Sequence, residues 1–464
     1  MTTDRVMPTD NLLTTDSVLE HIRSEAIHTV RVLFTDQHGL LRGKAIAAST
    51  MATVFENGIG VPGSLLHKDL RGNHVIGLWE PTGHRQLDEL VGARNIVLRP
   101  DPNTFRPIPW MEPGTAVVLS DLETTSGAPI ELSTRQIYRK ALSSLDSQHR
   151  FRAGLELEFH LFRCDDSGEL HNSHQGWDLL GEEGLDRLQP ILEALRRCLS
   201  ELGMPPATIE IEHGPSQVEL TFEPAIGLEI ADQAVLVRTA IRHTARRHGH
   251  QATFMSRPSI GGDNFPSGWH VHQSLVSDSN LDSLFVPPDS EQLLSPIGEH
   301  FVAGILRNAS AACLLTTPTV TGYKRYRPNA VTPDRITWSN EHRGAMIRVV
   351  GGTGDPSTRI ENRAGDPAAN PYLLLASQVI SGIDGLTNQL VPPPPTDSPY
   401  ATNAGVALPR TLGEAVTEFD QSDVFQAALG GDVVDYLVAL KRAEWHRFSQ
   451  AVTDWEQREY FDRF

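Results

Sequence analysis

Cysteine is scarce in this sequence, and its scarcity excludes two classes of protein. Only three cysteines occur in 464 residues, and Cys164, Cys198 and Cys313 have the spacing of neither a thiolate metal site nor a redox pair. A disulfide-stabilised secreted domain and a thiolate zinc protein are therefore not expected. A reducing, cytoplasmic compartment fits this cysteine usage.

Long apolar runs and an excess of basic residues are also missing. No run of about 18 apolar residues suggests a membrane span, and the beginning MTTDRVMPTD is polar and acidic, unlike a signal peptide. The 40 Lys and Arg residues are outnumbered by 58 Asp and Glu residues, which gives a formal net charge of −18. Partners such as nucleic acid or an anionic membrane surface are therefore not expected. An anionic substrate would need a local cluster of arginines.

Length and patterning predict two domains of α+β structure. A chain of 464 residues exceeds the usual size of one core. We expect a small domain over 17–105, containing a strand–turn–strand unit at 28–49, and a larger domain over 106–464. Apolar spacing predicts helices over 185–203, 229–249, 297–313 and 433–455. The last of these is expected to bury Leu437, Leu440, Phe448, Val452 and Trp455.

The segment AGLELEFHLF, residues 153–162, places acidic residues on an otherwise apolar strand. Because side chains alternate along a strand, Glu156 and Glu158 share one face and Leu155 and Leu157 the other. Side chains of the same kinds recur on a predicted hairpin at 207–222, on a predicted strand at 267–276 and near residue 360, and they are Glu212, Glu219, His270, His272 and Glu361. If these strands join one sheet, the carboxylates repel one another unless cations neutralise them. Oxygen ligands with one imidazole suit Mg²⁺ or Mn²⁺.

Arginine clusters in three loop-rich segments, YKRYRPNAVTP, NEHRGAMIRVVG and STRIENRAG. They carry Arg325, Arg343, Arg348, Arg359 and Arg363. Guanidinium groups bind carboxylates and phosphates in bidentate fashion, so these arginines with metal ligands suggest phosphoryl transfer to or from a carboxylate. For any single Glu or Arg, a solvated surface position is the alternative.

Seven strings, in order along the chain, resemble the glutamine synthetase superfamily. They are VRVLFTDQHGLLRGKA, GLELEFHLF, EHGPSQVEL, SGWHVHQSL, PTVTGYKRYRP, HRGAMIRV and RIENRAGDPAANPYL. The resemblance extends over nearly the whole chain. It implies an N-terminal β-grasp domain and a catalytic domain with a curved antiparallel sheet and helices. It also implies a ring-shaped homo-oligomer with sites at subunit boundaries, in bacteria usually a dodecamer of two hexameric rings.

The resemblance also implies a role for each matching residue. Glu158, Glu212 and Glu219 match the ligands of one divalent ion, and Glu156, His270 and Glu361 those of a second. Asn264, Arg325 and Arg363 match residues that bind glutamate, and Arg343 matches a catalytic residue that stabilises the phosphoryl group. ATP contacts match His272, Ser274, Arg348 and Arg359. The implied reaction activates the γ-carboxylate of glutamate as an acyl phosphate, which an amine then attacks.

The positions that handle ammonium in true glutamine synthetases do not match. In NGIGVPGSLL, Pro62 and Leu65 replace the Asp and second Ser of an Asp-Gly-Ser-Ser string. The segment YKRYRPNAVTP, residues 323–333, is called the flap below, and its Val331 stands where those enzymes carry a catalytic Glu. The loop GDNFPSGWH differs as well, with Phe265 and Pro266 where Gly is expected.

An apolar pocket of Pro62, Leu65 and Val331 suggests an amine other than ammonia: an alkylamine, amino alcohol, polyamine or weakly basic arylamine. An alkylamine would need a base, for which Asp334, Glu341 and Asp69 are candidates. Two alternatives stay open, an ordinary glutamine synthetase and a non-catalytic protein of the same fold.

Overall fold

A mixed six-stranded sheet organises the N-terminal part of the computed structural model, which describes residues 13–260 and 265–464. Its main path runs β2-β1-β6-β4-β3, and β1 lies antiparallel to β2 and parallel to β6. The elements are α1 (Thr15–Ser24), β1 (Thr29–Thr35), β2 (Leu41–Ala47), α2 (Met51–Asn57), β3 (Ile59–Pro62), α3 (Arg85–Asp88), β4 (Asn95–Pro100), β5 (Arg106–Pro107) and β6 (Thr115–Glu123), with short 3₁₀ turns at 48–50, 63–67 and 102–104.

The predicted strand–turn–strand unit is present as β1 and β2. Val30, Val32 and Phe34 alternate into the core. Asp36 caps the turn, because its Oδ1 accepts the backbone N–H groups of His38 and Leu40 at 2.9 and 3.0 Å. Since β5 and β6 lie beyond residue 105 yet pair within this sheet, we propose that the domain boundary follows Glu123.

A ten-stranded sheet forms the centre of the catalytic part. Its path is β14-β15-β16-β13-β7-β10-β9, with β8, β11 and β12 paired to the long β7. The strands are β7 (His149–Cys164), β8 (Leu170–Asn172), β9 (Pro206–Ile211), β10 (Gln217–Phe222), β11 (Ala225–Ile226), β12 (His250–Thr253), β13 (Trp269–Ser277), β14 (Trp338–Asn340), β15 (Ile347–Val350) and β16 (Arg359–Asn362). Leu155, Leu157, Phe159 and Leu161 of β7 are all buried, as their alternation predicts.

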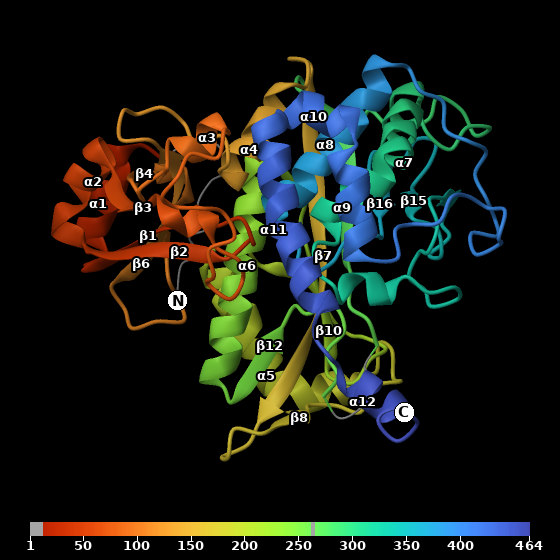
Figure 1. The fold of residues 1–464 in the computed structure, drawn as a ribbon, viewed down its shortest axis with the longest axis horizontal. Coiled ribbons are helices and arrows are strands. Elements are labelled where there is room, and N and C mark those ends of the chain that lie inside the picture. The colour runs from red at the N-terminus through yellow and green to blue at the C-terminus, as the bar shows by residue number, and fades with distance from the viewer. Residues whose placement is uncertain (1–12, 261–264) are drawn as a thin grey trace.

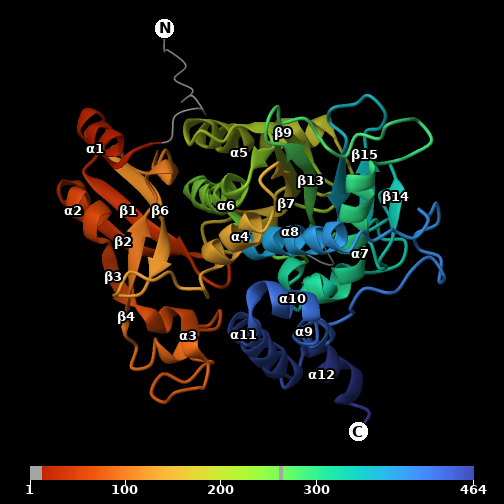
Figure 2. The same ribbon diagram turned by 90° about the horizontal axis from the view of Figure 1, so that it is seen from above.

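Helices cover the catalytic sheet and separate it from the N-terminal sheet. They are α4 (Thr134–Ser143), α5 (Glu182–Glu201), α6 (Leu228–Arg247), α7 (Pro296–Thr316), α8 (Pro371–Thr387), α9 (Leu412–Asp420), α10 (Asp423–Leu429), α11 (Gly431–Ser449) and α12 (Asp454–Tyr460), with a 3₁₀ turn at 322–325. Figures 1 and 2 show α4 and α6 between β6 and β7. In the described residues, no helix is both long and apolar enough to cross a membrane.

The predicted C-terminal helix is interrupted. Leu437 and Leu440 are buried on α11, but α11 ends at Ser449. A capping box then starts α12, in which Thr453 accepts the N–H of Glu456 and Glu456 accepts the N–H of Thr453. Because the chain turns at this cap, Val452 and Trp455 are 70% and 57% exposed, and the expectation that they are buried in the chain is wrong.

Candidate active site

Strand register brings the predicted carboxylates and histidines to one face of the catalytic sheet. Glu219 of β10 lies directly opposite Glu158 of β7, and His270 of β13 lies opposite Glu156. His272 lies opposite Glu361 of β16. Residues directly opposite one another have neighbouring side chains on the same face, so four strands contribute to a single polar surface inside the protein.

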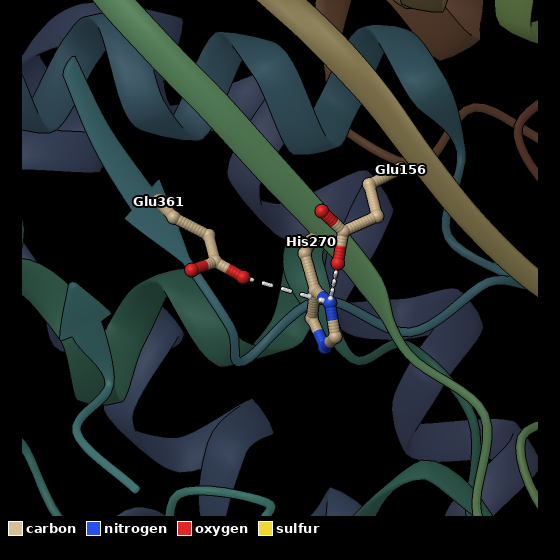
Figure 3. A group of neighbouring side chains, drawn as sticks. All are labelled: Glu156, His270 and Glu361. Carbon is tan, nitrogen blue, oxygen red and sulfur yellow. Dashed lines mark hydrogen bonds and ion pairs between the residues drawn. The ribbon is translucent and has the colours of Figure 1, made fainter. Parts of the chain in front are cut away.

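Three of these side chains form a compact group around His270. Its Nδ1 lies 2.5 Å from Oε1 of Glu156 and 3.6 Å from Oε1 of Glu361. Figure 3 shows the two carboxylates approaching the imidazole from different strands. Each of the three residues offers a ligand atom within 4.8 Å of the others.

A second group shares the same imidazole. Ligand atoms of Glu158, Glu219 and His270 also lie within 4.8 Å of one another. Glu158 is held in place because its Oε2 accepts the side-chain amide of Gln217 at 2.6 Å and the N–H of Gly268 at 3.0 Å. Glu212 follows β9 outside this compact group, and its charge acts on both Glu158 and Glu219. The structure thus brings five of the six predicted metal ligands into two groups, with the sixth beside them.

Burial and mutual repulsion make these carboxylates costly to ionise without a cation. Burial, with the charge of Glu212, raises the pKa of Glu158 to about 8. Burial, with the charges of Glu156, Glu158 and Glu212, raises the pKa of Glu219 to about 10. Burial also acts to raise the pKa of Glu156, but His270 and His272 lower it on balance. Hard oxygen donors with one imidazole fit a divalent ion of the Mg²⁺ or Mn²⁺ type.

All four predicted ATP contacts line one cavity of about 600 Å³ next to Glu156. Two of them are held by neighbours: Arg348 Nε donates to Oε2 of Glu361 at 2.5 Å, and Arg359 Nε donates to Nδ1 of His272 at 3.0 Å. Ser274, the fourth, is buried.

Sequence reasoning missed Arg152, which lines the same cavity. It precedes Glu156 by four positions on β7 and therefore lies on the same face, a periodicity that could have identified it. Three arginines, Arg152, Arg348 and Arg359, line this cavity, and guanidinium groups are suited to binding a polyphosphate.

The two arginines predicted to bind glutamate are both buried, Arg325 near His270 and Arg363 beside Glu361. Arg325 is 2% exposed, and its Nη1 donates to the carbonyl of Gly365 at 2.7 Å. Gly268 lies between this guanidinium and His270: an added Cβ would lie 2.9 Å from Nη2 of Arg325 and 2.7 Å from Nε2 of His270. Arg363 donates to Oε1 of Glu361 at 2.5 Å.

Two predicted site residues remain, Arg343 and Asn264, and the structure describes only Arg343. Arg343 is exposed on the loop between β14 and β15. Asn264 lies outside the described residues.

The predicted amine pocket is divided within one chain. Val331 is 44% exposed on the flap and has a φ of +60°, an unusual conformation for a β-branched residue. Pro62 ends β3 and Leu65 follows it, and both views place β3 on the opposite side of α4 and α6 from β7 and β15. The structure therefore does not bring Pro62 and Leu65 to Val331 of the same chain.

The three candidate bases, Asp69, Glu341 and Asp334, differ in their exposure and hydrogen bonds. Asp69 is 3% exposed and fully engaged, accepting the N–H groups of Arg71 and Asn73 at 2.8 and 2.9 Å and pairing with Arg447 at 2.5 Å. It holds a loop, and its prediction as a base is wrong. Glu341 is exposed, and Oδ1 of the half-buried Asp334 has no hydrogen-bond partner in the described part of the chain.

Comparison with known proteins decides the family. The sequence model of the family "Glutamine synthetase, catalytic domain" matches residues 131–460. The chain belongs to the glutamine synthetase family. It is 39% identical to the gamma-glutamylanilide synthase of Acinetobacter sp., over 96% of this chain and 95% of that protein. It is 32% identical to the glutamine synthetase of Thermotoga maritima, over 97% and 99% of the two chains.

The fold agrees with this assignment. A solved structure of GmaS without ligand superposes with a TM-score of 0.82 at 26% identity, covering 96% of this chain and 99% of that one. The predicted family and α+β fold are therefore confirmed. As a member of this family, the protein is an ATP-dependent ligase that uses a divalent metal.

Proposed function

We propose that the protein joins the γ-carboxylate of glutamate to an amine other than ammonia, with ATP as the energy source. Val331 carries this proposal: it is an apolar, partly exposed side chain on the flap, in a sequence that has the other metal-ligand and arginine positions of the family pattern. The 39% identity to a gamma-glutamylanilide synthase supports the same class of reaction.

The proposed chemistry has two steps. A γ-carboxylate oxygen of glutamate attacks the γ-phosphorus of ATP and displaces ADP, which makes an acyl phosphate. The amine nitrogen then attacks the acyl carbon, loses a proton, and phosphate departs with the former carboxylate oxygen. A carboxylate is a poor electrophile before this activation, so the first step is needed whatever the amine.

We assign the chain's residues to these steps as follows. The six ligands Glu156, Glu158, Glu212, Glu219, His270 and Glu361 would hold two Mg²⁺ or Mn²⁺ ions, which supply charge neutralisation to the phosphoryl group. Arg325 and Arg363, with Asn264, would orient glutamate. Arg348, Arg359, His272 and Ser274 would hold ATP, and Arg152 adds a further cation to that cavity. Arg343 would stabilise charge on the transferring phosphoryl group.

Protonation disfavours ammonia-like nucleophiles in such a pocket. An alkylammonium with a pKa near that of Lys is neutral in only about one molecule in a thousand at pH 7, which costs about 4 kcal/mol without a base. Val331 supplies no base, and Asp69 is engaged elsewhere. Asp334 is the candidate base left closest to the flap along the chain.

A second copy of the chain would complete the amine pocket. Because Pro62 and Leu65 lie in the N-terminal domain, away from Val331, we propose that a neighbouring subunit supplies them. This agrees with a homo-oligomer of the ring type, and we propose a dodecamer. Three unpaired cysteines support a reducing, cytoplasmic location.

An amine screen tests the proposed function. The protein is incubated with glutamate, ATP and Mn²⁺ and with ammonium, alkylamines, amino alcohols, polyamines or arylamines in turn, and products are detected by mass. We expect a γ-glutamyl amide of an organic amine to form faster than glutamine. Glutamine as the main product would identify an ordinary glutamine synthetase, and absence of any product would identify a non-catalytic protein.

A further inference from the structure

An aromatic cluster stands next to the carboxylates and has no part in the chemistry described above. The ring of Phe265 stacks on His213, with centroids 5.2 Å apart and planes 17° from parallel. The indole of Trp177 lies nearly perpendicular to the same phenyl ring, with centroids 6.3 Å apart and planes at 85°. Three separate segments of the chain therefore converge on one aromatic surface.

Backbone contacts fix this cluster beside Glu212. The N–H of Trp177 donates to the carbonyl of His213 at 2.7 Å, and the N–H of Leu180 donates to the carbonyl of Ile211 at 2.9 Å. Glu212 is the residue between these two acceptors, and its Oε2 lies 3.4 Å from Nδ1 of His213. The backbone of Trp177 is thus held at the end of β9 that leads into a predicted metal ligand.

The opposite side of the cluster connects to a second predicted ligand. Gln217 donates through Nε2 to Oε2 of Glu158 at 2.6 Å and to the carbonyl of Pro266 at 3.2 Å. Gly214 permits this packing, because a Cβ there would lie 2.6 Å from Cβ of Phe265. The Phe265–Pro266 pair therefore places an aromatic ring at a fixed position relative to the carboxylates.

Trp177 is costly to the fold in this position. Its side chain is 75% exposed and its φ is +65°, and Leu180, with a φ of +59°, is 60% exposed. Non-glycine residues in the left-handed region cost on the order of 1 kcal/mol or more and persist where the surroundings impose them, often at binding sites. Core packing does not account for an exposed indole in a strained loop, whereas ligand binding does.

We infer that Trp177, His213 and Phe265 bind the ring of an aromatic amine and so determine the nucleophile of the proposed ligation, on which this inference rests. Aromatic faces also attract alkylammonium ions, but they would hold the protonated, unreactive form. An arylamine is weakly basic and neutral at pH 7, so the cluster can present its nitrogen in the reactive state without a base. This matches the absence of a carboxylate at Val331.

The experiment compares aniline, ethylamine and hydroxylamine as nucleophiles with glutamate, ATP and Mn²⁺. Hydroxylamine is small and reports activation of glutamate independently of the aromatic cluster. The wild-type protein should use aniline with a higher kcat/KM than ethylamine. Trp177→Ala should lower kcat/KM for aniline about tenfold, as expected for loss of an aromatic pair with its buried area, and change the hydroxylamine rate less than about twofold.

Two further variants separate ring binding from loop structure. Trp177→Phe should restore most of the aniline activity, and Trp79→Ala, which removes an equally exposed indole (75%) from the N-terminal domain, should change neither rate. Equal losses with aniline and hydroxylamine in Trp177→Ala, or a wild-type preference for ethylamine, would overturn this inference alone. If none of the three nucleophiles gives a product, the proposed function and the inference are both overturned.

Discussion

The two ends of the site are built from different kinds of structure. At the phosphoryl end, Glu156, Glu158, Glu219, His270 and Glu361 stand on the strands of one sheet, buried or nearly so and paired by register. At the proposed nucleophile end, Val331 and Trp177 stand on loops, exposed and in left-handed conformations. Substitution of a buried strand residue disturbs the residues paired with it on neighbouring strands, whereas substitution of an exposed loop residue disturbs few neighbours. We infer from this comparison that activation of the acid and choice of the amine are separable.

Loss of a carboxylate at the phosphoryl end should have the largest effect. Glu361→Gln removes a charge that contacts His270, Arg348 and Arg363. Replacing a residue that only contacts a metal ligand lowers metal affinity or activity about 10–100-fold. Loss of a direct ligand should cost more, so we expect turnover to fall at least about a hundredfold with every amine. Phosphate release measured with several amines checks this, and normal turnover with any one of them would refute the proposed role.

Metal removal should affect the stability of the same end. A divalent ion at about 100 times its Kd stabilises the folded state by about 2.7 kcal/mol, so a chelator should lower the unfolding temperature by several degrees. Glu219→Gln should stabilise the metal-free protein at neutral pH, because burial raises the pKa of Glu219 and folding must therefore protonate this carboxyl. The same change should reduce the response to Mn²⁺. Calorimetry of the wild type, Glu219→Gln and the exposed-loop control Glu80→Gln measures both effects. An unchanged response to Mn²⁺ in Glu219→Gln would argue against its role as a ligand.

A change at the nucleophile end should alter selectivity and spare activation. Val331→Glu places a carboxylate on the flap, where it can pair with ammonium and accept its proton. We expect kcat/KM for ammonium to rise about tenfold, the low end of what a positioned base contributes, with little change in KM for ATP. Val391→Glu, at a valine that is 79% exposed outside the flap, is the matched control. No gain with ammonium would show that the flap assignment is wrong.

Anchoring of the flap should give the smallest effect. The hydroxyl of Tyr400 donates to the carbonyl of Thr332 at 3.2 Å, and its ring lies against Gly344, where a Cβ would be 2.7 Å from Cε2. Tyr400→Phe keeps the ring and removes a hydrogen bond worth about 1 kcal/mol. We expect KM for the amine to rise about fivefold, and an equal rise in KM for ATP would contradict a role confined to the flap.

The phosphoryl end follows from the sequence more closely than the nucleophile end does, for a physical reason. Alternation along a strand is a local property, so the sequence by itself assigns Glu156 and Glu158 to one face of their strand. Pairing between strands then brings His270 and Glu361 to the same face, in agreement with the ligand sets that the family resemblance implies.

Trp177 and Asp69 show why the rest could not be predicted. The position of the indole depends on backbone hydrogen bonds to His213 across a turn, and the engagement of Asp69 depends on Arg447 from the other end of the chain. The exposure of Val452 and Trp455 depends on where α11 stops, and apolar spacing alone does not reveal the cap at Thr453.

Transfer of oxygen from glutamate to phosphate tests the central claim most directly. Glutamate labelled with ¹⁸O in its γ-carboxylate is incubated with ATP, Mn²⁺ and the best amine, and the released phosphate is analysed by mass. Activation as an acyl phosphate predicts one labelled oxygen in each phosphate, with every amine and in Val331→Glu as well. Phosphate without label would contradict the account, because ATP would then have been cleaved without phosphorylating the acid.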